Sequence, residues 1–381
     1  MKHLFAALMG SALFIVPASA QTIRIGAVVS ETGPGASLGI PEANSLRLLP
    51  TEIDGHPVEY TILDDGSDPT RAVTAMRRLV TETNVDAVIG STVTPASLAM
   101  VEVAGELEVP TISLAGSAAI VTPVEGPRRW VFKTAQNDAL MAGAIADHMA
   151  ANDVGTVGIV AFSDSYGDNW INVITPLLEE RGIEIVATER YARTDTSVTG
   201  QVLRVTSARP DAVFVIAAGT PAVLPQQGLR QRNFDGPVYQ THGVANADFL
   251  RVGGDAVEGA IMPVGPVVVA DQLPDDHPSK QAAVAYKDEY EAAHGEGSVS
   301  AFGSYAHDAG ILLQNAVPVA LEGAEPGTPE FRAALRDALE GLSDVTYVNG
   351  VANMSAEDHV GQDERARVMV TIENGDWVLL P

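Results

Sequence analysis

Alternation of short apolar strands with amphipathic helices is the feature of this sequence that most restricts its fold. A buried strand is expected over residues 23–29, and it leads through a glycine-rich loop into a helix. A second strand is expected over residues 58–63, and apolar residues recur at helical spacing over residues 70–83. Short strands over residues 87–89 and 111–114 continue the series. Such alternation predicts an α/β fold with a mainly parallel sheet covered by helices on both faces.

The alternation restarts after residue 133 and then stops. Strands and helices alternate again from a helix over residues 137–149 to one over residues 246–252. From about Pro263, three helical stretches follow without strands of their own, and the chain ends in a β-hairpin over residues 367–379. This order predicts two lobes between which the chain recrosses, and a small third domain is the alternative. Two lobes also suit a chain too long for one hydrophobic core.

The first 20 residues are typical of a cleavable export signal. Lys2 precedes an apolar run over residues 4–16, and Ala18-Ser19-Ala20 forms a cleavage site, so we expect cleavage after Ala20. A membrane anchor is the alternative, but the run is shorter than the ~20 apolar residues that a span needs. The chain contains no cysteine, which excludes thiolate catalysis, cysteine zinc sites, disulfides and a lipid-modified cysteine. We therefore expect an exported protein of a Gram-negative periplasm without a membrane anchor of its own.

Charge excludes some partners. Removing Lys2 with the leader leaves 22 basic and 49 acidic residues, a net charge of −27. This charge argues against nucleic acid and anionic lipid as partners. The run Asp275-Asp276-His277 lacks the spacing of a metal site and is expected to be a solvated loop. No metal and no cofactor is therefore expected.

Several short motifs occur in a characteristic order along nearly all of the mature chain. They are Thr32-Gly33-Pro34, Leu63-Asp64-Asp65-Gly66-Ser67-Asp68-Pro69, Val88-Ile89-Gly90-Ser91, Val109-Pro110-Thr111-Ile112-Ser113, Ser165-Tyr166-Gly167 and Gly243-Val244-Ala245-Asn246. In this order they resemble the leucine/isoleucine/valine-binding protein family, the solute receptors of ABC importers. The resemblance implies the two-lobed type I periplasmic binding protein fold, with three hinge crossings near Thr134, Pro263 and Thr346. Residues 21–134 plus 264–345 would form lobe 1, and residues 135–263 plus 346–381 would form lobe 2.

Two loops of the first lobe have features of an anion site. Thr94 is a good N-cap with Pro95 in the first helical position, and a helix start offers free N–H groups to a carboxylate. The segment Ala115-Gly116-Ser117 follows a neighbouring strand, at the sheet edge where open α/β folds bind ligands. Ordinary helix capping is the alternative. The resemblance implies that Thr92, Thr94, Ala115 and Ser117 hold a ligand carboxylate.

The second lobe is expected to supply the other side of the site. The resemblance implies that Tyr166 places its ring over the ligand, although a core role is the alternative. His242 stands where amino-acid receptors of the family usually carry an acid, Gly219 stands near a frequent tyrosine, and Leu38 replaces another aromatic residue. A neutral imidazole is a poor partner for an ammonium group. The ligand is therefore expected to be a small carboxylate with a hydrophobic body, either an aliphatic amino acid or an aromatic or branched acid without the amine.

Other classes of function were weighed against a receptor. Gly35-Ala36-Ser37-Leu38-Gly39 matches the G-x-S-x-G pattern of hydrolases, and with Gly33 it also approaches a dinucleotide fingerprint. No histidine of the chain lies in a triad motif, and Pro34 disrupts a phosphate-binding turn. We expect no enzyme, and Ser37 and Leu38 are expected to line the cleft. A sensory ligand-binding domain is a further alternative. The expected receptor is a monomer that closes around its ligand and docks on a permease.

Overall fold

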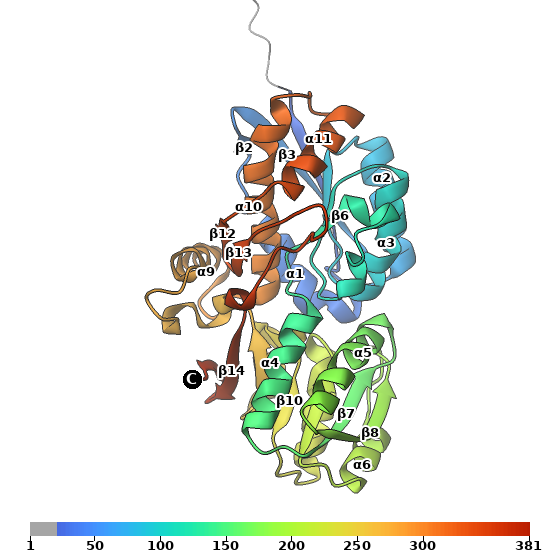
Figure 1. Cartoon of the computed structure of the whole chain (residues 1–381), viewed down its shortest axis with the longest axis vertical. Helices are drawn as coiled ribbons and strands as arrows, with labels where there is room; N and C mark the ends of the chain where they lie inside the picture. The colour runs from blue at the N-terminus through green and yellow to red at the C-terminus, as the bar shows by residue number, and fades with distance from the viewer. Residues whose placement is uncertain (1–20) are drawn as a thin grey trace, which may run out of the picture.

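The structure, a computed structural model, describes residues 21–381 and consists of two α/β lobes stacked along the long axis (Figure 1). Each lobe is built on a sheet of its own. The fold class predicted from the sequence is therefore confirmed. The predicted leader, residues 1–20, lies outside the described residues.

The sheet of the first lobe has six strands in the order β2-β3-β1-β4-β5-β6. Five of them are parallel, and the short β2 is antiparallel at one edge. β1 and β4 are almost entirely buried, as apolar strands covered on both faces must be. The bounds are β1 (Ile23–Val29), β2 (Glu52–Ile53), β3 (His56–Asp64), β4 (Ala87–Gly90), β5 (Thr111–Ser113) and β6 (Val131–Lys133).

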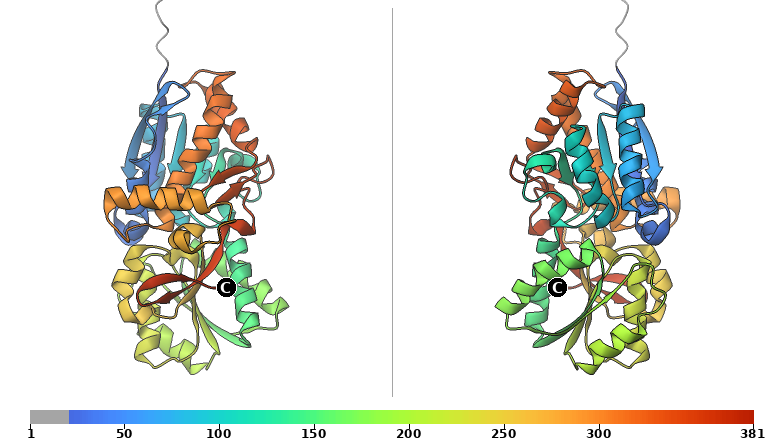
Figure 2. Two further views of the ribbon diagram at one scale, coloured as in Figure 1. Left: turned by 90° about the vertical axis from the view of Figure 1, so that its left-hand side faces the viewer. Right: turned by 90° about the vertical axis from the view of Figure 1, so that its right-hand side faces the viewer.

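Helices from distant parts of the sequence cover this first sheet. α2 (Pro69–Glu82) and α3 (Thr94–Glu106) pack together on one face. α1 (Ala36–Leu46) packs on α10 (Ala301–Leu321), and α10 also contacts α11 (Pro329–Glu340). Figure 2 shows these late helices against the early strands of the same lobe. The helices that lack strands of their own therefore complete the first lobe.

The second sheet has seven strands in the order β15-β14-β11-β10-β9-β7-β8, parallel except for the C-terminal hairpin at one edge. The predicted hairpin is β14–β15. Five α-helices accompany the sheet. The bounds are α4 (Asp138–Ala151), β7 (Thr156–Phe162), α5 (Ser165–Glu180), β8 (Glu184–Tyr191), α6 (Thr199–Ser207), β9 (Ala212–Ile216), α7 (Val223–Gln231), β10 (Val238–Gln240), α8 (Ala247–Gly253), β11 (Ile261–Val264), β14 (Val368–Glu373) and β15 (Asp376–Leu379).

Two local features of the second lobe differ from what the sequence predicts. Asp195, a good N-cap residue shortly before α6, is predicted to cap that helix, but its carboxylate accepts a hydrogen bond from the Ala192 amide, at 2.8 Å, and closes a turn before the helix. α7 was not predicted, since Pro225 and Gly228 weaken its helical pattern. A side chain at Gly228 would meet Val202 of α6 at 3.0 Å, so the glycine allows the two helices to approach. Tertiary packing outweighs propensity in this helix.

The chain passes between the sheets more than once. It leaves the first sheet after Lys133 and enters α4 at Asp138, and it leaves the second sheet after β11 towards α9 (Lys280–His294) and α10. The strands β12 (Val345–Tyr347) and β13 (Gly350–Ala352) form a separate pair. Beyond them, the His359 carbonyl still accepts a hydrogen bond from the Lys133 amide, at 3.1 Å. The last passage into the second sheet therefore comes after His359, later than the expected Thr346, while the predicted lobe limits stay a prediction.

No helix between residues 21 and 381 has both the length and the apolar character required to cross a bilayer.

Candidate ligand-binding site

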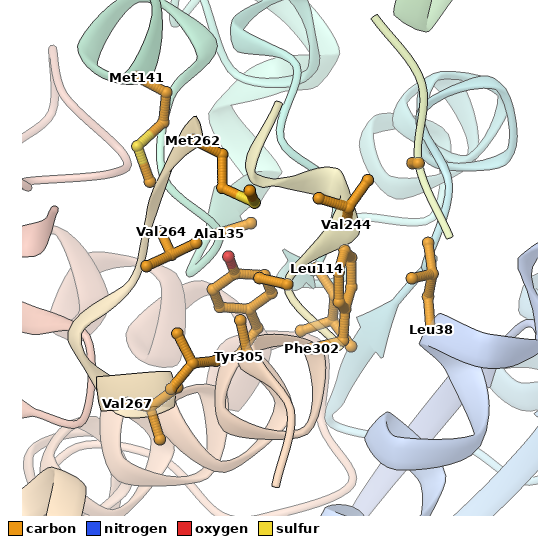
Figure 3. Packing of buried hydrophobic residues seen from close by; sticks show 14 of the residues in the cluster. Leu38, Leu114, Ala135, Met141, Val244, Met262, Val264, Val267, Phe302 and Tyr305 are labelled. Atoms are coloured by element: carbon orange, nitrogen blue, oxygen red, sulfur yellow. The ribbon is translucent and has the colours of Figure 1, made fainter. Parts of the chain in front are cut away.

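A small cavity of about 20 Å³ lies between the lobes, at the carboxyl ends of the parallel strands. This volume is about what a single water molecule needs, so a larger ligand enters the cavity only when the lobes move apart. Its lining is largely apolar, and Figure 3 shows Leu38, Leu114, Phe302 and Tyr305 among the buried side chains that meet there. Six of the nine predicted site residues belong to the lining: Leu38, Thr92, Thr94, Ala115, Tyr166 and His242. Their role in binding stays a prediction.

The two threonines of the first lobe differ in what their hydroxyls contact. The Thr92 hydroxyl donates a hydrogen bond to Glu42 and accepts one from the Ser30 amide, at 2.9 Å. Thr94 is not the N-cap that the sequence predicted, because Val93 occupies that position and Thr94 is the first residue of α3. Its buried hydroxyl has no hydrogen-bond partner in residues 21–381. Thr92 therefore holds the wall together, whereas Thr94 has a free polar atom at the cavity.

Glu42 lies behind this wall, one helical turn after Leu38 in α1. Burial raises the pKa of Glu42 well above its usual value, and the hydrogen bond from Thr92 offsets part of that increase. The carboxyl group is fully buried and does not belong to the cavity lining. It stabilises the loop that carries Thr92 and leaves the cavity surface itself without an acid.

The loop after β5 approaches the second lobe very closely. A side chain at Gly116 would lie 2.7 Å from His242 Nε2 and 2.9 Å from Asp138 Oδ1, so only glycine fits between the lobes at this point. The Ala115 amide donates to Ser113 Oγ, at 3.3 Å. The predicted site residue Ser117 is buried outside the lining, and its Oγ accepts from the Ala119 amide, at 3.3 Å.

Three buried titratable groups surround Gly116. Burial, together with the charge of Lys133, lowers the pKa of His242 to about 3, so the imidazole is neutral. Its Nδ1 is inaccessible to solvent and has no hydrogen-bond partner in the part of the chain that the structure describes. Lys133 Nζ donates to the Gly116 carbonyl, at 2.6 Å. Burial lowers the pKa of Lys133 and raises the pKa of Asp138, while the opposite charge of each group limits both changes.

Tyr166 presents its ring from the start of α5. Asp164 caps this helix by accepting from the Tyr166 and Gly167 amides, at 3.0 and 3.3 Å. The Tyr166 hydroxyl lies 2.7 Å from Thr241 Oγ1, which itself donates to a backbone carbonyl, so Tyr166 is the donor. Burial raises the pKa of the phenol above its ordinary value. With the hydroxyl engaged, Tyr166 offers the cavity an aromatic face.

Ser37 and Gly219 join the lobes beside the cavity and do not line it. Ser37 Oγ accepts a hydrogen bond from the Thr220 amide, at 3.3 Å. Gly219 has a φ of 64°, and a side chain there would meet Ser37 Oγ at 2.8 Å, so no larger residue fits this contact. In residues 21–381, the hydrogen-bond partner of the Ser37 hydroxyl is thus a backbone amide. Gly39 of the same pattern lets α1 pack against the end of β1, since a side chain there would lie 2.2 Å from the Ser30 carbonyl.

Three large lining residues were missed by the sequence reasoning: Arg193, Phe302 and Tyr305. Arg193 follows the end of β8 at the predicted binding edge, and this position could have identified it as a lining residue. Phe302 and Tyr305 lie in α10, more than 100 residues after the nearest first-lobe strand, and no local pattern indicates that they reach the cavity. The Tyr305 hydroxyl is buried without a partner in residues 21–381, and burial raises its pKa.

A larger hollow of about 240 Å³ lies outside the cleft, near α9 and the 3-10 segment η7 (Pro266–Gln272). Its lining includes Lys287 and Asp271, whose side chains form an ion pair of 2.5 Å. The hollow is open and does not lie at the carboxyl ends of the parallel strands. The smaller cavity between the lobes is therefore the better candidate.

Comparison with known proteins agrees with the fold. Residues 22–376 match the family model described as periplasmic binding protein. The chain belongs to this family, the binding proteins of ABC transporters, and membership implies a periplasmic location. The resemblance to the leucine/isoleucine/valine-binding proteins is thus confirmed.

Individual relatives show how far the similarity extends. The leucine-, isoleucine-, valine-, threonine- and alanine-binding protein of Pseudomonas aeruginosa is 22% identical over 269 residues, 68% of this chain and 71% of that protein. An extracellular ligand-binding receptor from Rhodopseudomonas palustris HaA2 is 43% identical, with a TM-score of 0.91 over 94% of this chain and 100% of the other. A solute-binding protein of an ABC transporter from Rhodopseudomonas palustris BisB5, in complex with 3,4-dihydroxybenzoic acid, is 20% identical. Its TM-score is 0.79, over 94% of this chain and 96% of that one, and at this identity it shows the fold alone.

Proposed function

We propose that this protein is the solute receptor of an ABC importer and captures a small carboxylate with a hydrophobic body. The observation that carries this proposal is the cavity between the lobes, with three buried polar atoms that have no partner in residues 21–381: Thr94 Oγ1, His242 Nδ1 and Tyr305 Oη. Buried polar atoms without partners are costly. A ligand whose polar groups satisfy such atoms and whose body fills the apolar remainder removes that cost.

Two relatives indicate which ligands of this class to consider. An aliphatic amino acid would match the amino acids for which the Pseudomonas aeruginosa relative is named, and an aromatic acid would match the 3,4-dihydroxybenzoic acid bound to the Rhodopseudomonas palustris BisB5 protein. The predicted binding residues Leu38, Thr92, Thr94 and Ala115 of the first lobe meet Tyr166 and His242 of the second lobe at the cavity. Ser117 is proposed to support its loop, and Ser37 and Gly219 to close the edge of the cleft.

Hinge closure is the proposed mechanism. Both lobes contribute to the cavity, so a ligand that touches both walls stabilises the closed arrangement over an open one. The closed monomer then docks on a membrane permease and releases the ligand. We further propose that the leader is removed after Ala20 during export.

A binding screen tests this function. Leucine, phenylalanine, benzoate and 4-methylpentanoate would be added to the purified mature protein, with benzamide as the uncharged control for benzoate. At 100 times its Kd, a ligand adds roughly 2.7 kcal/mol to the free energy of unfolding, which raises the Tm by several degrees. Small-angle scattering should show compaction with the same compound. A protein that no small carboxylate stabilises would contradict the proposal, and esterase activity lost in Ser37→Ala would favour a hydrolase instead.

A further inference from the structure

Arg193 is the one formally charged side chain among the residues from 21 to 381 that line the cavity. It stands two residues after the end of β8, at the binding edge of the second sheet. Its side chain is only 12% exposed, so the guanidinium group lies largely away from bulk water. A charge in such a place has a strong effect on which ligands can enter.

The guanidinium group is fixed from one side only. Its Nε donates to Asp164 Oδ2, at 2.5 Å, and its Cζ lies 4.3 Å from the centre of the Phe162 ring and 5.6 Å from that of the Tyr166 ring. Neither terminal nitrogen has a hydrogen-bond partner in residues 21–381. Asp164 is itself occupied by the amides that it caps at the start of α5. Arg193 is therefore held rigidly while two donor groups remain available, the arrangement that suits a carboxylate.

The donors predicted on the opposite wall are mostly engaged. The Thr92 hydroxyl donates to Glu42, the Ala115 amide donates to Ser113, and Ser117 lies outside the lining. Of these four residues, Thr94 keeps a hydroxyl without a partner in the described chain, and the Tyr305 hydroxyl of α10 is a second one. The first-lobe wall thus offers fewer donors to an anion than the sequence indicated.

An ammonium group would find no anionic partner. The residues that line the cavity include no aspartate or glutamate within the described range. Glu42 lies behind Thr92, and Asp138 lies behind Gly116 with Lys133 and Asn169 as neighbours. The neutral His242 carries no negative charge. An ammonium group placed here would lose its water without compensation, close to the positive charge of Arg193.

We propose that Arg193 binds the anionic group of the ligand and that the cleft takes small hydrophobic carboxylates that carry no ammonium group. This inference rests on the proposed function and narrows its ligand class. Thr94, His242 and the Tyr305 hydroxyl then serve uncharged polar groups of the ligand, such as a hydroxyl or a carbonyl. Zwitterionic amino acids of the same shape are rejected by the unpaired ammonium.

Matched ligand pairs give the test on the wild-type protein. Titration calorimetry at pH 7 would compare 4-methylpentanoate with leucine and 3-phenylpropanoate with phenylalanine, since each pair differs only by the amine. We expect the acid without the amine to bind at least about tenfold more tightly in the pair whose body fits, because a buried unpaired charge is costly. A leucine or phenylalanine that binds as well as its partner would overturn the inference while leaving the receptor function intact. Failure of all four compounds, and of benzoate, would overturn both.

Substitution of Arg193 tests the residue itself. Arg193→Gln should raise the Kd of the preferred carboxylate about 10- to 100-fold, the effect of losing a charged hydrogen-bond partner. It should also shrink the preference for the acid over the amino acid, because Asp164 then loses its cationic partner beside the cavity. A merely structural role would not change that ratio. Arg193→Lys keeps the charge and should bind better than Arg193→Gln.

Arg190→Gln is the matched control. Arg190 lies three residues earlier, near the end of β8, and donates to the Phe162 carbonyl, at 2.7 Å, but it does not line the cavity. Its substitution should leave the Kd and the ligand preference unchanged. If Arg193→Gln fails to fold, Arg193→Lys and the wild-type ligand pairs still decide the question. An unaltered Kd and unaltered preference in a folded Arg193→Gln protein would overturn the assignment.

Discussion

The two walls of the cavity differ in how their polar groups are used. On the first-lobe wall, hydroxyls and amides are largely bound to one another, as in the link from Ser30 through Thr92 to Glu42. On the second-lobe wall, Arg193 and His242 keep polar atoms without partners in residues 21–381. Among residues 21–381, the first wall therefore leaves two uncharged hydroxyls without partners, those of Thr94 and Tyr305, whereas the second wall carries the charged group that distinguishes ligands. Substitutions on the two walls should therefore affect stability and ligand affinity to different extents.

The largest effect is expected where the two walls touch. In Gly116→Val, the Cβ atom of the new side chain would lie only 2.7 Å from His242 Nε2, so the lobes could not close. We expect ligand affinity to fall more than about 100-fold, since the ligand depends on contacts from both lobes. Scattering should show no compaction with ligand, whereas circular dichroism should show a folded protein.

Gly143→Ala is the control for that substitution, because a side chain at Gly143 meets nothing within 4 Å. It lies in α4, and alanine there should leave binding unchanged and stabilise the helix by about 0.5–1 kcal/mol. If Gly116→Val closed around ligand as the wild type does, the close contact of the two walls at Gly116 would be contradicted.

A second prediction concerns the buried imidazole of the second wall. The pKa of His242 is about 3 in the folded protein, below the ~6.5 of an unfolded chain. The unfolded state therefore binds more protons between these values, and the stability contributed by neutral His242 is lost as the pH falls from about 6.5 towards 3. The loss amounts to at most about 1.4 kcal/mol per pH unit.

The measurement for His242 is the difference in unfolding free energy between wild type and His242→Asn from pH 7 to pH 4. Taking the difference removes the contribution of other buried groups, such as Asp308, whose pKa burial raises to about 8. Lys133 and Asp138 face the same imidazole and are retained in both proteins. We expect the variant to lose less stability in acid. Parallel curves for the two proteins would show that His242 is not held neutral.

The smallest effects compare two threonines on the first wall. Thr92→Val removes the hydroxyl that bonds Glu42 and Ser30, and it should lower the free energy of unfolding by about 1–3 kcal/mol. Thr94→Val removes a hydroxyl without a partner in the described residues, so stability should change little while the Kd rises several-fold. Denaturant unfolding and calorimetry of both variants check the pair. An equal loss of stability in both variants would contradict the prediction that only the Thr92 hydroxyl stabilises the wall.

Much of the architecture could be predicted because its signals are local. The strand at Ile23–Val29 was placed with the bounds that the structure shows, since a run of apolar residues reports that an element is buried. The order of short motifs identified the family, and the family model confirms it. The loops after β4 and β5 were placed at the binding edge because parallel strands share one carboxyl end.

Other features were decided only by the tertiary structure. Nothing near Thr92 in the sequence indicates that its hydroxyl is bound by Glu42, 50 residues earlier, while that of Thr94 has no such partner. The start of α3 shows that local preference can also fail, since Val93 occupies the N-cap although threonine is a preferred N-cap residue. Hydrogen-bond partners of this kind depend on contacts between segments that are far apart in the chain.

The sequence by itself therefore determined the two-lobed α/β fold, the family and the edge of the sheets at which a ligand is expected. The tertiary structure alone decided which of the polar residues at that edge remain free, that α10 delivers Phe302 and Tyr305 to the cavity, and that Arg193 is its charged group. The physical reason is that burial periodicity is a property of each element, whereas the lining of a cleft between two lobes is set by where those elements meet.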